Sequence, residues 1–175
     1  MLALVTYYSV HGSTKEIAER IGSVLSTKTK VEVLPMEQVT ELSKYYFVII
    51  GSPVHNFVWV EYASSWLSTN GAALSNSAVW AFSVGTPFAV GKIAQRMLDS
   101  EDEEQNLAAA ISEEVRLERH VLFNGRFLKS HARTKFNFWW RVFGGKFGDF
   151  RDWEEIDKWA GDIGDTIVRR TGWVA

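Results

Sequence analysis

The chain has 175 residues, 46% of them hydrophobic, which is enough for one domain with a substantial core. Its formal net charge of -2 points to no nucleic-acid partner, and its lack of cysteine excludes disulfides, catalytic thiolates and cysteine-ligated metal centres. No apolar run reaches the roughly 18 residues that a membrane span requires. We therefore expect a single domain over residues 1–175, located in the cytoplasm.

Apolar runs bounded by turn residues alternate with amphipathic patterns, which predicts a parallel sheet covered by helices on both faces. Right-handed crossovers favour a three-layer α/β sandwich with five parallel strands in the order 2-1-3-4-5. A ligand then binds at the carboxyl ends of strands one and three. The expected strands cover residues 2–8, 31–34, 46–51, 78–84 and 120–123, and the expected helices 13–26, 62–67, 91–98, 100–117 and 152–171.

The most informative segment is the loop between the first strand and the first helix. It contains Ser9, His11, Gly12, Ser13 and Thr14, directly after an apolar run. Hydroxyls and main-chain N–H groups there meet the positive end of a helix dipole, which suits a phosphate. The loop matches neither a Walker A motif nor a dinucleotide-binding fingerprint. It therefore suits a single phosphate monoester, such as that of flavin mononucleotide (FMN).

A simpler interpretation of the same loop stays open. Ser13 is followed three residues later by Glu16, the spacing of a capping box. On this interpretation Ser13 caps the first helix and does nothing more.

Several motifs resemble those of flavodoxin-domain proteins. Tyr8-Ser9-x-His11-Gly12-Ser13-Thr14-x-x-Ile17-Ala18 resembles their opening motif, and residues 48–53 and 82–87 resemble two later landmarks. Residues 148–153 (Gly-Asp-Phe-Arg-Asp-Trp), leading into Ile156-x-x-Trp159-Ala160, are most similar to the branch that contains quinone-linked protoporphyrinogen oxidases. The resemblance spans nearly the whole chain and implies a flavodoxin-like α/β fold.

The resemblance also implies an FMN site built from three loops at one edge of the sheet. The first loop would hold the phosphate, and the loops after strands three and four would flank the isoalloxazine ring. Phe57, Trp59 and Phe88 are candidates to stack on the ring, with ordinary core packing as the alternative for each. The candidate cofactor residues are Ser9, His11, Gly12, Ser13, Thr14, Pro53, Val54, His55, Asn56, Phe57, Trp59, Ser83, Val84, Gly85, Thr86, Pro87 and Phe88.

Two loops depart from the family's pattern. His11 and Ser13 replace the first and third residues of the usual Thr-Gly-Asn-Thr loop. The loop after strand three lacks the family's glycine, and Asn56 is the best local substitute because asparagine tolerates positive φ.

Residues 127–150 fit neither a strand nor a clear helix and are predicted to form an insertion before the last helix. From Arg126 to Arg151 there are seven basic residues and one acid, so this stretch carries +6 and the remainder -8. It also contains eight Phe and Trp residues. A covering flap, contact with an anionic membrane, a pocket for a flat anionic substrate such as a porphyrin, and an oligomer contact all stay open.

The leading functional hypothesis is an FMN-dependent oxidoreductase acting on a small-molecule redox substrate. By resemblance, its most specific version is oxidation of protoporphyrinogen IX with a quinone acceptor. A one-electron carrier and a flavodoxin-like binding module without FMN are the alternatives. No catalytic side chain is assigned, because flavin chemistry needs no protein nucleophile. Four histidines without a His-x-x-x-His spacing predict no metal site.

Overall fold

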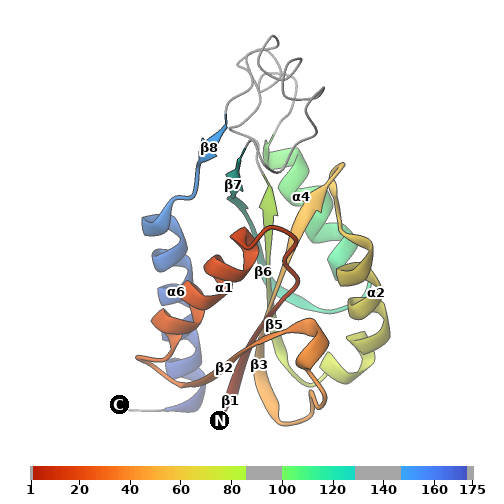
Figure 1. The fold of residues 1–175 in the computed structure, drawn as a ribbon. Coiled ribbons are helices and arrows are strands. Elements are labelled where there is room, and N and C mark those ends of the chain that lie inside the picture. Colours follow the sequence, from red (N-terminus) through yellow and green to blue (C-terminus); the bar gives the residue numbers. More distant parts are fainter. Residues whose placement is uncertain (1, 86–99, 129–146, 173–175) are drawn as a thin grey trace.

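The structure is a computed structural model that describes residues 2–85, 100–128 and 147–172 (Figure 1). The strands are β1 (Leu2–Tyr7), β2 (Lys30–Pro35), β3 (Tyr45–His55), β4 (Val58–Trp59), β5 (Ala78–Gly85), β6 (Leu117–Asn124), β7 (Arg126–Phe127) and β8 (Gly148–Asp149). The helices are α1 (Ser13–Leu25), α2 (Glu61–Asn70), α4 (Ser100–Ser112) and α6 (Trp153–Thr171), with 3-10 turns at Met36–Gln38 and Gly71–Leu74.

Five of these strands form one parallel sheet in the order β2-β1-β3-β5-β6. Numbered by their place among the parallel strands, this is the predicted order 2-1-3-4-5. The short strand β4 pairs antiparallel with the end of β3. The carboxyl ends of β1, β3 and β5 therefore meet at one edge of the sheet.

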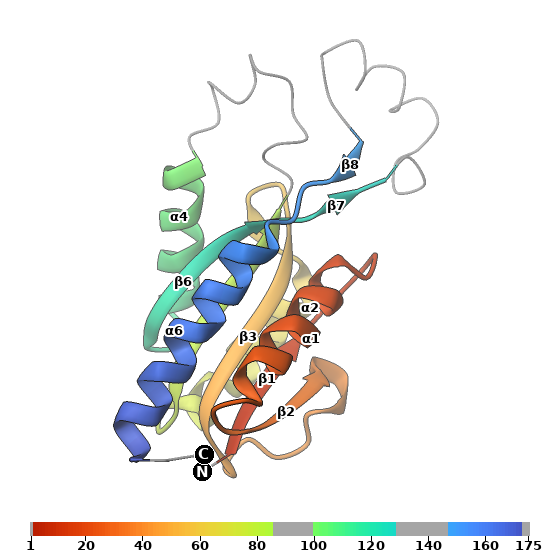
Figure 2. The ribbon, with the colours of Figure 1, turned by 90° about the vertical axis from the view of Figure 1, so that its left-hand side faces the viewer.

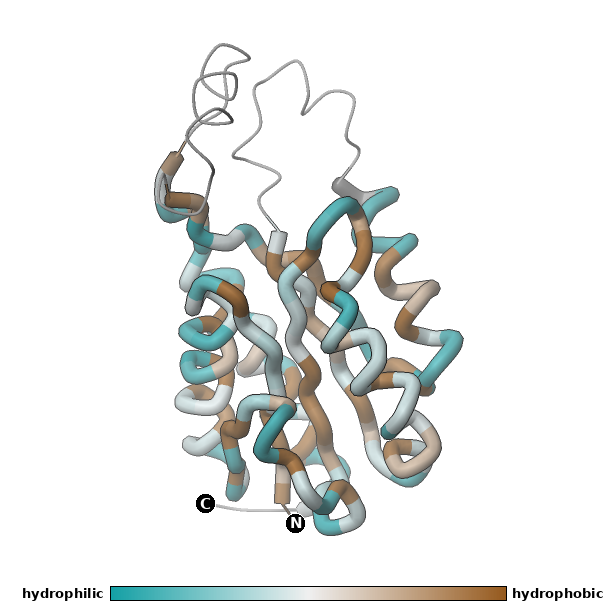
Figure 3. The backbone as a smooth tube through the Cα atoms, turned by 45° about the vertical axis from the view of Figure 1, so that its right-hand side comes forward, coloured by the Kyte–Doolittle hydropathy of each residue, from teal (hydrophilic) through white to brown (hydrophobic). Residues whose placement is uncertain are grey.

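Helices cover the sheet on both faces, which gives three layers (Figure 2). Successive side chains along a strand point to opposite faces of the sheet, so apolar residues at consecutive positions form a core on each face that helices must cover. Val5 packs in a core with Ile21 of α1 and Ile163 of α6. Its neighbour Leu4 packs in the other core, together with helices α2 and α4. Figure 3, which colours the chain by residue hydropathy, shows hydrophobic residues along the central strands.

Several element boundaries differ from the expectations. The helix predicted over residues 100–117 ends at Ser112, because Leu117 pairs with Val79 at the start of β6. Strand β3 extends to His55 because its last residues form a hairpin with β4. The helix predicted over 91–98 lies outside the described residues. No helix among the described residues is long and apolar enough to cross a bilayer.

The segment predicted to be an insertion without strands contains two short ones at its ends. Arg126 and Phe127 pair antiparallel with Asp149 and Gly148. The rings of Phe127 and Phe147 stack, with centroids 5.3 Å apart. The interpretation as a segment without strands is therefore wrong at its two ends, and residues 129–146 lie outside the described residues.

Two glycines in α6 provide a matched stability prediction. A Cβ added at Gly161 would meet no atom within 4 Å, so Gly161→Ala is expected to raise the free energy of unfolding by about 0.5–1 kcal/mol. A Cβ at Gly164 would lie 2.7 Å from Cδ of Lys28, the partner of Asp165 in an ion pair. Gly164→Ala is therefore expected to bring no such gain. Urea unfolding of both variants tests this, and equal stabilisation would contradict it.

Candidate functional site

The loop between β1 and α1 is held by hydrogen bonds to one hydroxyl. Ser9 Oγ accepts a hydrogen bond from the main-chain N–H of Gly12 at 3.1 Å and from that of Lys15 at 3.3 Å. Gly12 has a φ of 87°, a conformation that other residues rarely adopt. Ser9 and Gly12 together turn the chain sharply into α1 and bring the helix N-terminus to the edge of the sheet.

The capping-box prediction for Ser13 is wrong. Gly12 is the N-cap residue and makes no side-chain cap, and it is Ser9 Oγ that accepts from the N–H of Lys15 in the first turn. Ser13 is the first helical residue, and its Oγ instead accepts a hydrogen bond from the main-chain N–H of Arg126 at 3.1 Å. The next residue, Thr14, is only 2% exposed, and its hydroxyl has no hydrogen bond to any residue that the structure describes. Ser13 thus connects α1 to β7, while the Thr14 hydroxyl is left without a partner among the described residues.

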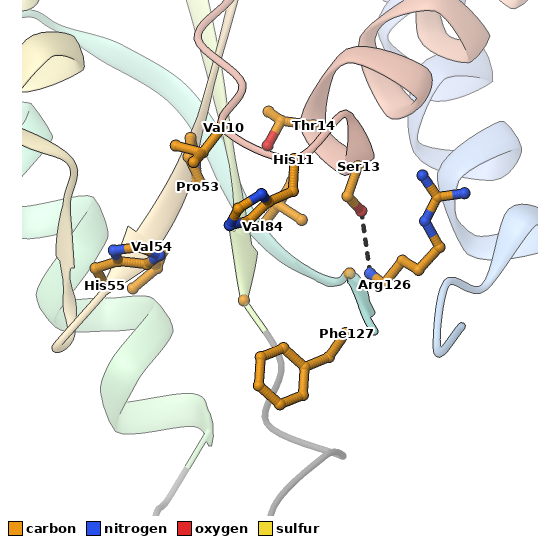
Figure 4. A pocket seen from close by; sticks show the side chains of 12 residues that line it. Val10, His11, Ser13, Thr14, Pro53, Val54, His55, Val84, Arg126 and Phe127 are labelled. Carbon is orange, nitrogen blue, oxygen red and sulfur yellow. Dashed lines mark hydrogen bonds between the residues drawn. The ribbon is translucent and has the colours of Figure 1, made fainter. Parts of the chain in front are cut away.

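A cavity of about 220 Å³ lies at the carboxyl ends of β1, β3 and β5 (Figure 4). His11 and His55 approach it from two different loops. No carboxylate is found among the described residues that line it, so the surroundings favour an anion. The lining residues are Val10, His11, Ser13, Thr14, Pro53, Val54, His55, Val84, Gly85, Gly125, Arg126 and Phe127.

A tight turn joins β3 to β4 beside this cavity. His55 pairs with Val58, so the turn has only two residues, Asn56 and Phe57, with φ of 53° and 65°. Positive φ at both positions is typical of a type I′ turn. The positive φ predicted at Asn56 is confirmed. Phe57 adopts it as well, at some cost in backbone strain, and its side chain is 54% exposed.

The comparisons with known proteins agree with this geometry. A family model described as a flavodoxin domain matches residues 4–135. The chain belongs to the flavodoxin domain family. No curated protein matches it.

Solved structures share the flavodoxin fold at low sequence identity. A flavodoxin from the domain Archaea is 18% identical with a TM-score of 0.58, and the match covers 95% of this chain and 99% of that one. Rubredoxin oxygen:oxidoreductase from Desulfovibrio gigas is 15% identical with a TM-score of 0.58. That match covers 96% of this chain and 36% of the oxidoreductase. A Lactobacillus acidophilus flavoprotein in complex with FMN is 14% identical with a TM-score of 0.51, and the match covers 69% of this chain and 91% of that one.

The structure brings about half of the predicted site residues of this flavodoxin domain into the cavity wall. Ser9, Gly12, Asn56 and Phe57 shape the adjoining loops without lining it. Thr86, Pro87 and Phe88 lie outside the described residues. The residues that reach the wall are His11, Ser13, Thr14, Pro53, Val54, His55, Val84 and Gly85.

Trp59 and Ser83, also predicted to bind cofactor, lie in the interior behind the cavity wall. Trp59 Nε1 donates a hydrogen bond to Ser83 Oγ at 2.7 Å, and Ser83 Oγ lies 2.8 Å from His120 Nε2. His120 is only 7% exposed, and burial lowers its pKa to about 4. The three side chains form a buried polar chain that connects β4 to the sheet beneath it.

The sequence analysis missed four lining residues: Val10, Gly125, Arg126 and Phe127. Gly125 lets the chain that leaves β6 pass close to the end of β5, since a Cβ there would lie 2.8 Å from Cγ1 of Val84. One signal was present in the sequence. Gly125 and Arg126 directly follow the fifth parallel strand, whose carboxyl end reaches the same sheet edge.

A chain of ion pairs connects this edge to the last helix of the flavodoxin domain. Glu16 in the first turn of α1 accepts hydrogen bonds from Arg126 at 2.9 Å and from Arg151 at 2.5 Å. Arg151, which is 4% exposed, also forms a bidentate pair with Asp149. The Arg151 guanidinium holds the pKa of the Glu16 carboxyl below its usual value. Asp152 then caps α6 by accepting from the N–H groups of Glu154 and Glu155.

Proposed function

We propose that this flavodoxin domain binds FMN, with the phosphate at the N-terminus of α1. The observation that carries the proposal is Thr14, a residue only 2% exposed, which lines a cavity without carboxylates and whose hydroxyl has no partner among the described residues. A phosphate oxygen would satisfy that hydroxyl. A flavoprotein of the same fold in complex with FMN also supports the proposal.

The residues present fit FMN in type. Ser13, Thr14 and the first main-chain N–H groups of α1 would hold the phosphate, as helix N-termini commonly do. The segment Pro53–His55 and the Asn56–Phe57 turn would flank the ring, with Phe57 offering an exposed aromatic face. FMN, when bound, supplies the electron exchange. The chain's own residues bind it, orient it and shield it from water.

Replacing both Ser13 and Thr14 by alanine tests the phosphate assignment. The double variant is expected to bind FMN about tenfold or more weakly, because two hydrogen bonds to a charged group are lost. Titration with FMN, followed by quenching of flavin fluorescence, measures the change. Ser26→Ala/Thr27→Ala is a matched control, because this exposed pair lies just beyond the other end of α1. If the unaltered chain binds no FMN, the proposal is wrong.

For the reaction we propose an oxidoreductase that passes electrons from a small molecule to a quinone. Its most specific form removes six electrons and six protons from protoporphyrinogen IX and reduces three quinones to quinols. The support is the similarity of residues 148–160 to the protoporphyrinogen oxidase branch. In this fold the motif residue Arg151 forms ion pairs, and Ile156 and Trp159 pack in the core.

A one-electron carrier is the second candidate, and one observation favours it. Outside Arg126–Arg151 the chain carries a formal charge of -8, which suits docking on basic protein partners. Anaerobic mixing of the reduced, FMN-loaded protein with a soluble quinone separates the two candidates. Rapid reoxidation, together with porphyrin fluorescence when protoporphyrinogen IX is supplied, supports the enzyme. Reoxidation only by redox proteins supports the carrier.

A further inference from the structure

The phosphate end of the cavity contains a cation that the sequence analysis did not assign. Arg126 lies in β7, one residue after Gly125 and the end of β6. Its main-chain N–H donates to Ser13 Oγ, as the dashed line in Figure 4 marks. A Cβ added at Gly12 would lie 3.8 Å from Nη2 of Arg126. The guanidinium therefore lies beside the N-cap of α1, where the proposed phosphate would bind.

Glu16 forms ion pairs with both Arg126 and Arg151, which cancel the negative charge that would oppose an anion. Glu16 lies in the first turn of α1, and alone its carboxylate would repel a phosphate at the helix N-terminus. One of its oxygens accepts from Arg126 and the other from the buried Arg151. With Asp149 on the far side of Arg151, the four side chains carry no formal net charge. Arg126 is the one that lines the cavity.

Two donors at this end of the cavity have no acceptor among the described residues. The Nε–H of Arg126 is buried and unpaired there. The second is the hydroxyl of Thr14, a residue 2% exposed that lines the cavity, so this donor faces the cavity without an acceptor. A buried donor without an acceptor is unfavourable, and an oxygen-rich anion removes that penalty. Both observations concern side chains and are independent of the helix dipole.

We propose that Arg126 is a phosphate-recognition residue that makes this cavity prefer a phosphorylated flavin to riboflavin. The proposal rests on the FMN site proposed above. A guanidinium forms charge-assisted hydrogen bonds with a phosphate, and these are stronger than the hydrogen bonds it forms with the uncharged ribityl hydroxyls of riboflavin. Arg126 therefore sets specificity, while the ring contacts contribute to both ligands alike.

Titration of the full chain with FMN and with riboflavin tests the proposal. Arg126→Gln is expected to weaken FMN binding about tenfold to a hundredfold and to change riboflavin binding by less than about twofold. Arg126→Lys keeps the charge and should fall between Arg126→Gln and the unaltered chain. Arg170→Gln is the matched control, because Arg170 pairs with Glu118 near the C-terminal end of α6, away from the cavity. Equal weakening of both flavins by Arg126→Gln, or of neither, would overturn the proposal.

Inorganic phosphate gives a readout that needs no flavin. Phosphate should raise the midpoint of thermal unfolding of the unaltered chain relative to chloride at equal ionic strength. Arg126→Gln should lose that rise, and Arg170→Gln should keep it. A rise with phosphate but no FMN binding would contradict the proposed function and leave Arg126 as an anion ligand. No rise in the unaltered chain would overturn the role of Arg126.

Discussion

Phe82→Ala is expected to lower the free energy of unfolding by about 3–5 kcal/mol. The Phe82 side chain is fully buried in β5, and its ring centroid lies 6.1 Å from that of Phe123 and 6.2 Å from that of Trp159. Its removal leaves a cavity between the sheet and α6 that rigid neighbours fill only in part. Urea unfolding measures the change. Tyr46→Ala is the control, because this β3 aromatic residue is exposed and its loss should cost far less.

A double-mutant cycle with Gly51 tests the same packing from the other side. A Cβ at Gly51 would lie 2.0 Å from Cζ of Phe82, and the ring is held against Phe123 and Trp159. Gly51→Ala alone should therefore be strongly destabilising. In the double variant the methyl group enters the space that the ring has left. The stability lost by the double variant should therefore be smaller than the sum of the two single losses by about 1 kcal/mol or more. Simple additivity would contradict the contact.

Stability is expected to fall by about 3 kcal/mol as the pH is lowered from about 6.5 to about 4, because of His120. Burial lowers the pKa of His120 to about 4, whereas the unfolded chain titrates near the ordinary value of 6.5. Between these values the unfolded state binds more protons, so acid favours unfolding. Above pH 6.5 the imidazole is neutral in both states and the dependence from this group ends.

His120→Gln is expected to remove this pH dependence, since an amide does not titrate while it can still bond to Ser83. Urea unfolding of both proteins at intervals from pH 7.5 to about pH 4 measures the difference between the two curves. Carboxyl groups contribute to both curves. For Glu16, whose pKa is lowered in the folded protein, the stabilising contribution is lost only as the pH falls below the usual pKa of a glutamate. Their contributions cancel in the comparison. Parallel curves would show that His120 does not titrate as expected.

The strand order and the loop at the helix N-terminus could be predicted because both depend on local pattern. Continuous apolar runs such as residues 46–51 identify strands buried on both faces, and right-handed crossovers restrict their order. Element ends were less predictable. Leu117 fits a helical pattern, yet it pairs with Val79 in the sheet because the tertiary ladder outweighs local preference.

The sequence alone determined the fold and the sheet edge at which the cavity lies, and about half of the residues that it predicted for the site line that cavity. Those features follow from periodicity and turn chemistry, which act over a few residues. Only the tertiary structure decided that Arg126 and Gly125 join the cavity wall, that Trp59 and Ser83 lie behind it, and that Ser13 bonds to β7 and does not cap α1. These contacts join residues 24 to 113 positions apart, and no local pattern specifies which distant partner satisfies a buried polar group.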